Sequence, residues 1–127
     1  MYKEIEIELA DGTVQMMPFK ACGTTSIRYH QFTRSEILKD VAIPNTPDNY
    51  YALDSAYSKL AYIMNKQATA KTVADMNNIN EDDYFEWLEN FASLEFATKS
   101  AQLLDIYLNN KETTVDSKKN PGQQTES

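Results

Sequence analysis

The sequence contains few of the residues on which most catalytic centres depend. Cys22 and His30 are its only cysteine and its only histidine, so the chain can form neither an internal disulfide nor a His–His metal pair. A Cys22–His30 dyad is arithmetically possible, but a single cysteine is more often a small core residue. Only three glycines occur, so neither type of glycine-rich phosphate-binding loop can be written. We therefore expect no catalytic residue, no metal, no cofactor and no enzymatic activity.

Positive charge and long apolar runs are also scarce. Twelve basic residues stand against 19 acidic ones, which gives a net charge of −7. This deficit argues against partners such as nucleic acid or an anionic membrane surface, because binding to either depends on clustered Lys and Arg. No run of about 20 apolar residues, the length that crosses a bilayer, occurs. The N-terminus lacks the pattern of a signal peptide, and a single cysteine suits a reducing compartment, so we expect a cytoplasmic protein.

The first twenty residues have the period-two pattern of a β-hairpin. Acidic and apolar side chains alternate from Glu4 to Leu9, as in a strand with one face in solvent. Asp11-Gly12 is a turn pair that tolerates positive φ, and a second apolar segment ends at Phe19. We predict a hairpin over residues 2–19. An isolated hairpin is marginally stable in water, so its apolar face must be covered by the helices that follow.

Three helical regions are predicted after the hairpin, over residues of about 25–42, 48–70 and 81–109. The first should bend near Thr33, because Thr33-Arg34-Ser35-Glu36 fits a capping box that would start a second short helix. In the third, Asn80 is a good N-cap, and the helix continues or restarts towards residue 109. The second region has an apolar stripe at the spacing of one helix face; its members are Leu53, Tyr57, Leu60, Ala61, Met64 and Ala68.

Residues 111–127 differ in composition from the rest of the chain. Val115 is their sole aliphatic residue, so this segment cannot bury enough apolar surface to offset the ordering of its backbone. We predict a disordered tail. The fold class is therefore mainly α (α+β), with the N-terminal hairpin packed on a bundle of four to six helices and residues 1–110 forming one globular domain.

Two tyrosines of the second helical region are candidates for partner contact. Tyr51 and Tyr62 are separated by 11 residues, about three turns of helix, so they share a face nearly opposite Leu53 and Leu60. Either a second packing layer covers both tyrosines or they form a contact face for a partner, since tyrosine offers large area at low entropic cost.

Three other residues are included with Tyr51 and Tyr62 as partner-binding candidates. Arg28 and Tyr29 stand near a helix start, where they are either structural pins or contacts. Trp87 lies at the edge of the apolar stripe of the last helical region. The members of that stripe are Tyr84, Phe85, Leu88, Phe91 and Ala92.

Negative charge is concentrated at the start of the last helical region. Six acidic residues and no Lys or Arg occur between Glu81 and Thr98. Such a run is either a solvated helix face or a docking surface for a basic partner segment, where it would accelerate association. An acidic first helical turn also fits the helix dipole.

The order of these features resembles the tail assembly chaperones of long-tailed phages that infect Gram-positive bacteria. The resemblance covers residues 2–110 and starts with the hairpin that ends at Phe19. The further segments that carry it are Gly23-Thr24-Thr25, Arg28-Tyr29, Glu36-Ile37-Leu38, Leu60-Ala61-Tyr62-Ile63-Met64 and Phe85-Glu86-Trp87-Leu88. One departure is evident, because a Phe-Gly pair is common in the family where this chain has Thr33-Arg34-Ser35.

The resemblance implies a non-enzymatic protein of the host bacterial cytoplasm that is absent from the finished virion. Proteins like it bind the tape measure protein, keep it soluble and promote polymerisation of the major tail protein around it. Many of their genes also encode a longer product by ribosomal frameshifting, for which A-rich codons at Lys111 and Lys118-Lys119 would be suited. Self-association is left open.

A small acidic adaptor or inhibitor that binds a host or phage protein is the alternative. An inhibitor that mimics nucleic acid needs carboxylates spaced across a surface like phosphates. Here the acidic residues cluster at one helix start and on one strand, which favours a helix cap and a solvated strand face.

Overall fold

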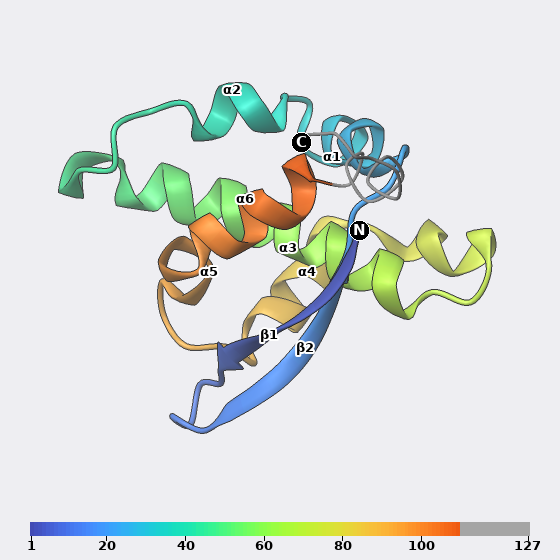
Figure 1. The fold of residues 1–127 in the computed structure, drawn as a ribbon, viewed down its shortest axis with the longest axis horizontal. Coiled ribbons are helices and arrows are strands. Elements are labelled where there is room, and N and C mark those ends of the chain that lie inside the picture. The colour runs from blue at the N-terminus through green and yellow to red at the C-terminus, as the bar shows by residue number, and fades with distance from the viewer. Residues whose placement is uncertain (110–127) are drawn as a thin grey trace, which may run out of the picture.

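An N-terminal hairpin is followed by a succession of helices in the computed structural model, which describes residues 1–109 (Figure 1). The strands are β1 (Tyr2–Glu8) and β2 (Val14–Lys20). The α-helices are α1 (Thr25–Thr33), α2 (Ile37–Val41), α3 (Tyr50–Thr69), α4 (Glu81–Leu88), α5 (Glu95–Thr98) and α6 (Ser100–Leu108), and the 3₁₀ helices are η1 (Pro47–Asn49) and η2 (Val73–Asn78). The predicted mainly α fold with an N-terminal hairpin is confirmed. The predicted disordered tail, residues 111–127, lies outside the described residues.

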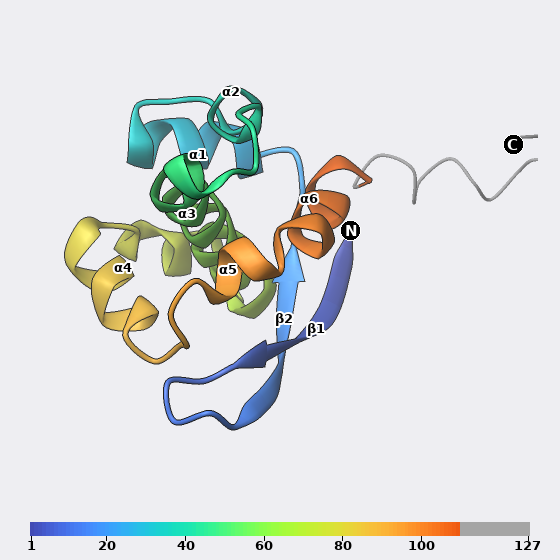
Figure 2. The same cartoon turned by 90° about the vertical axis from the view of Figure 1, so that its left-hand side faces the viewer.

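The hairpin buries one face, as its alternating pattern predicts. β1 and β2 pair antiparallel with Ile5 opposite Met17, and Ile5, Ile7, Met17 and Phe19 are buried. β2 packs against α3, while the turn lies at the end of the molecule away from α1 and α2 in both views (Figure 1, Figure 2). Gly12 in this turn has a φ of 89°. Glycine adopts such a positive φ at little steric cost, because it has no Cβ atom.

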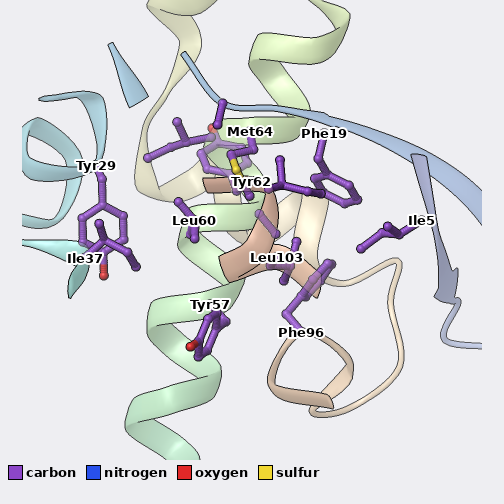
Figure 3. Packing of buried hydrophobic residues seen from close by; sticks show 14 of the residues in the cluster. Ile5, Phe19, Tyr29, Ile37, Tyr57, Leu60, Tyr62, Met64, Phe96 and Leu103 are labelled. Atoms are coloured by element: carbon purple, nitrogen blue, oxygen red, sulfur yellow. The ribbon is translucent and has the colours of Figure 1, made fainter. Parts of the chain in front are cut away.

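Helix α3 is the central element of the core. It packs against β2 and against every other helix of the described residues, and Figure 3 shows its side chains between those of the hairpin and of the surrounding helices. The five consecutive residues from Leu60 to Met64 are completely buried. The predicted stripe is therefore only one part of the buried surface, because this stretch of α3 is covered on all sides, unlike an ordinary amphipathic helix.

The first helical region is divided into α1 and α2, as predicted, but the predicted capping box is wrong. Thr33 ends α1, and its hydroxyl donates to the carbonyl of Tyr29 at 2.8 Å. Helix α2 follows Glu36, whose side chain makes no capping hydrogen bond. The chain changes direction at Arg34, which has a left-handed φ of 63° and donates its N–H to the carbonyl of His30 at 2.7 Å.

We expect the substitution Arg34→Gly to stabilise the protein. A left-handed backbone costs a non-glycine residue roughly 1–2 kcal/mol, part of which is offset by the greater freedom of glycine in the unfolded chain. The free energy of unfolding, measured by urea titration, should rise by roughly 0.5–1 kcal/mol. Lys39→Gly within α2 is the control and should lower it by about 1 kcal/mol. Equal losses in the two variants would contradict the assigned strain.

The third helical region is interrupted between α4 and α5, so the predicted restart is confirmed and the alternative of one continuous helix over residues 81–109 is wrong. The predicted cap is present, since the side chain of Asn80 accepts the N–H of Asp83 at 2.9 Å. Beyond α4 the chain turns at residues 89–90, and Phe91 then forms a β-bridge with Leu9 next to the hairpin turn. Hydrogen bonds to the hairpin replace those of a continuing helix, and this long-range pairing leaves no periodic signal in the sequence.

Asp83 connects α4 to α3 through two polar contacts. Its carboxylate accepts the hydroxyl of Tyr62 at 2.6 Å and forms an ion pair with Lys66 at 2.8 Å. The hydrogen bond and charge of Lys66, followed by the hydrogen bond of Tyr62, hold the pKa of Asp83 below its ordinary value. Burial and the bond to Asp83 raise the pKa of Tyr62, which therefore stays a donor.

The contribution of Asp83 to stability should depend on pH. Its folded-state pKa is lowered, so the contribution is present above the unfolded pKa of about 3.9 and is lost as the pH falls through the folded value. We expect Asp83→Asn to reduce the free energy of unfolding by about 1 kcal/mol at pH 7. This difference from the wild type should shrink between about pH 5 and pH 3 in urea titrations. A difference that is independent of pH, or one matched by the exposed Asp82→Asn control, would refute the assignment.

Candidate functional site

An apolar groove lies between α4, the first half of α3 and the segment that joins α4 to α5. Its volume is about 210 Å³. Helix α4 ends at Leu88 and the following segment is held to the hairpin at Phe91, so the chain turns back along one side of the groove. This α4 groove is defined by the lining residues Asp54, Phe85, Leu88, Glu89, Phe91 and Leu94.

Three large side chains at or beside the α4 groove are exposed to solvent. The exposed fractions are 85% for Tyr51, 51% for Phe85 and 44% for Leu94. The ring of Phe85 lies 5.1 Å from that of Tyr84. Burial raises the pKa of Tyr84, and the nearby carboxylate of Asp54 adds to this rise. Grouped exposed apolar side chains of this size are typical of a contact surface rather than of an ordinary monomer surface.

Leu94 is held in a strained conformation at the groove. Its φ is 62°, which costs a non-glycine residue roughly 1–2 kcal/mol. The N–H and the hydroxyl of Thr98 both donate to the Leu94 carbonyl at 3.0 Å. The next residue, Glu95, is buried and accepts the N–H of Glu8 at 2.9 Å. Neighbouring contacts therefore impose this conformation, and strain of this kind concentrates at functional sites.

Asp54 contributes a partly buried carboxylate to the groove. Burial raises the pKa of Asp54, and a hydrogen bond from the N–H of Ala97 at 3.3 Å opposes that rise without cancelling it. Within residues 1–109 this carboxylate forms no ion pair. Its chemistry suits a Lys or Arg side chain supplied from outside, because charge-assisted hydrogen bonds strengthen where water is partly excluded.

The six acidic residues between Glu81 and Thr98 fall into two groups, of which, within residues 1–109, one forms ion pairs and the other does not. Asp83 and Glu95 are engaged with Lys66 and Lys99, respectively. The other four carboxylates are exposed and form no ion pair within the described part of the chain; they belong to Glu81, Asp82, Glu86 and Glu89. Glu89 also lines the groove, so negative charge reaches the apolar surface itself.

The two predicted tyrosines have different environments. Tyr51 is exposed, whereas Tyr62 is completely buried and packs edge-to-face on Tyr84 at 5.4 Å. Helix α4 covers the α3 face at Tyr62 and leaves it open at Tyr51. The partner-contact interpretation is therefore wrong for Tyr62, which belongs to the packing layer, and only Tyr51 remains accessible.

Trp87 also belongs to the packed interior. Its indole N–H donates to the side-chain oxygen of Asn65 at 3.1 Å, and its ring stacks on Phe96 at 5.2 Å. It is partly buried against the hydrophobic cluster. These contacts make it a link between α4, α3 and α5, so the structure gives no support to a partner-contact role.

Arg28 and Tyr29 are separated although they are adjacent in sequence. Tyr29 is buried, and its hydroxyl donates to Asp40 at 2.7 Å, which ties α1 to α2 and fits the structural alternative. Burial and this bond raise the pKa of Tyr29. Arg28 is half-buried and lines another cavity together with Lys20 and Lys71. None of these three residues lines the α4 groove.

Cys22 and His30 line different cavities. Cys22 lies beside Arg28, while His30 faces a depression between α1, α2 and α6 that also includes Tyr107. The ring nitrogen Nδ1 of His30 is 3.2 Å from the carbonyl oxygen of Ser35. The thiol and the imidazole are therefore not brought together as a dyad.

Phe85, Leu94 and Asp54 are the site residues that the sequence patterns missed. Phe85 stands in the predicted apolar stripe, but it follows Tyr84 directly, and neighbouring helix residues point about 100° apart. Tyr84 takes the buried position with its hydroxyl 2.5 Å from that of Ser58, and Phe85 is left exposed. The adjacent aromatic pair indicates that only one of the two rings can take the buried position of the stripe. No pattern in the sequence indicates Leu94 or Asp54 as a site residue.

Comparison with known proteins supplies no relative. No family model matches the chain, and neither the curated proteins nor the solved structures contain a match. Among the described residues, no helix combines the length and apolar content needed to cross a membrane. Within residues 1–109 no three His, Cys, Asp or Glu side chains are grouped to hold a metal ion.

We expect Asp54→Asn to stabilise the protein at neutral pH. The folded-state pKa of Asp54 is raised, so its ionisation lowers stability as the pH rises from the unfolded towards the folded pKa. The substitution should raise the free energy of unfolding by roughly 0.5–1 kcal/mol at pH 7, and this gain should vanish below about pH 4. Urea titrations at both pH values test this, with the exposed Asp48→Asn as control. A loss of stability at pH 7 would contradict the assigned desolvation.

Proposed function

We propose that the protein is a phage tail assembly chaperone that binds the tape measure protein, keeps it soluble and promotes polymerisation of the tail tube around it. It would act in the host bacterial cytoplasm and be absent from the virion. The observation that carries this proposal is the exposed apolar surface of Phe85 and Leu94 in the α4 groove, together with the exposed Tyr51 one turn before Asp54 on α3. The resemblance of residues 2–110 to this family supports it.

A helix is the occupant that suits the groove. An amphipathic helix binds by laying its apolar residues into a groove at positions i, i+3, i+4 and i+7. A tape measure protein is mostly long amphipathic helix, according to the resemblance, and exposes such stripes before the tube surrounds it. Covering one stripe removes it from water and from other copies, which is the physical basis of keeping the protein soluble.

The charges around the groove favour basic residues on the bound helix. Asp54 and Glu89 line the groove, and Glu86 lies exposed one turn before Glu89. A Lys or Arg beside the apolar stripe of the partner would meet these carboxylates. Complementary charge of this kind accelerates association and selects the partner more than it adds affinity.

Two matched serine variants test the proposal. Phe85 and Leu38 are each 51% exposed, but only Phe85 lines the α4 groove. In co-expression with a helical fragment of the tape measure protein from the same genome, the wild type and Leu38→Ser should keep the fragment soluble. Phe85→Ser should not, and its Kd for the purified fragment should rise about 30-fold, the effect of losing an interface anchor worth about 2 kcal/mol.

The outcomes separate the site from the function. If the wild type leaves the fragment insoluble, the chaperone function is refuted, and binding to some other protein without an effect on solubility would favour the acidic adaptor. If both variants fail equally, the function stands but the α4 groove is not the binding site. Urea titration of each variant excludes unfolding as the cause.

A further inference from the structure

A second cavity lies between the end of β2, the start of α1 and η2. Its volume is about 370 Å³. Three basic side chains from three different segments line it: Lys20 ends β2, Arg28 belongs to α1, and Lys71 follows α3. We name it the basic pocket after these three residues. No Asp or Glu is among its lining residues.

The positive charge of the basic pocket is not neutralised by the surrounding protein. The chain as a whole carries a net charge of −7, yet within residues 1–109 none of Lys20, Arg28 and Lys71 forms an ion pair. The neighbouring carboxylate of Asp75 accepts the backbone N–H groups of Lys71 and Thr72 instead, at 2.8 and 3.0 Å. Three like charges at one cavity repel one another, and an anion would relieve that repulsion.

Arg28 has a buried donor without a partner. Its Nε is inaccessible to solvent and makes no hydrogen bond to the described residues. An unsatisfied buried donor costs free energy, and such groups are rare enough to require an explanation. A guanidinium also presents its donors in a planar fork that matches the oxygens of a phosphate. An oxyanion in the cavity would meet the terminal N–H groups of the same guanidinium, which form no hydrogen bond within the described residues and, unlike Nε, are not buried without a partner.

A buried hydrogen-bond network makes one wall of the pocket rigid. Thr25 is completely buried; its hydroxyl donates to the side-chain oxygen of Gln67 at 2.7 Å and accepts the N–H of Cys22 at 2.9 Å. The amide of Gln67 then donates to the hydroxyl oxygen of Thr24 at 2.9 Å. The Thr24 hydroxyl also lies 3.4 Å from the sulfur of Cys22, so its single proton is available to that sulfur and the network fixes both side chains at the wall.

The thiol of Cys22 lies at the same wall, and its pKa is lowered mainly by hydrogen bonds. Partial burial opposes formation of the thiolate, but hydrogen bonds from Thr24 and Thr25 and the charge of Lys20 outweigh it, so the pKa of Cys22 is lowered. The N-terminus of α1 starts beside Cys22, with no side chain capping it, and its dipole adds a positive potential there.

We infer that the basic pocket binds a phosphate monoester. Lys20, Arg28 and Lys71 would hold the phosphate oxygens. The doubly charged headgroup fits three cations better than a carboxylate does. Val73, which is 78% exposed, and Met76 line the cavity as well, and they offer an apolar surface for the ester group. This inference is independent of the proposed chaperone function.

Calorimetric titration of the full chain with phenyl phosphate and with inorganic phosphate tests the inference at constant ionic strength. Phenyl phosphate should bind, and it should bind about tenfold more tightly than inorganic phosphate because its ring covers the apolar wall. Both affinities should fall as salt is raised. No binding of either compound would overturn the inference, and equal binding of the two would overturn the assignment of an ester.

Variants locate the binding. Lys20→Gln and Lys71→Gln should each weaken phenyl phosphate binding about tenfold, whereas Lys39→Gln, an exposed lysine of α2, should leave it unchanged. Equal effects in all three would place the anion elsewhere and overturn the site. Alkylation of Cys22 by iodoacetamide gives a second readout, because bound phosphate should slow the reaction in the wild type and not in Lys71→Gln.

Discussion

The burial of α3 on all sides is the constraint on which the rest of the structure depends. A hairpin of two strands cannot bury its apolar face alone, and the short helices around it are each below the length at which an isolated helix is stable in water. All of them use α3 as the common surface. The completely buried stretch from Leu60 to Met64 is therefore what makes the hairpin and the helices one hydrophobic cluster.

The same packing creates the candidate site. Helix α4 sits over the Tyr62 end of α3 and is fixed there by Asp83 and by the contacts of the Tyr62 ring with the rings of Tyr84 and Trp87. Because α4 has only eight residues, it cannot also cover the N-terminal part of the same face. Tyr51 and the apolar wall of the α4 groove stay exposed, so the proposed contact surface includes the part of the α3 face that the short helix leaves uncovered.

The sequence predicts those features that depend on local periodicity and fails where distant segments meet. The hairpin, the division near Thr33, helix α3 and the Asn80 cap follow from patterns within a few residues. The break after α4 depends on the β-bridge between Leu9 and Phe91, and no window of sequence contains both. For the same reason the sequence predicts that Tyr51 and Tyr62 share a helix face, but it does not predict that α4 covers this face at Tyr62 and leaves it open at Tyr51. Trp87 was assigned to a surface because its partner Asn65 lies on another helix.

The net charge of the chain also does not reveal how its charged side chains are distributed over the surface. A value of −7 correctly describes the surface near α4, where four carboxylates have no cationic partner among the described residues. It does not describe the cavity where Lys20, Arg28 and Lys71 converge from β2, α1 and the end of α3. Coulombic effects fall off within about 10 Å at ordinary ionic strength, so each surface would act on its proposed ligand through its own charges. Composition thus leads to the expectation that no basic face serves a polyanion, while the proposed small anion would respond to three side chains that only the fold brings together.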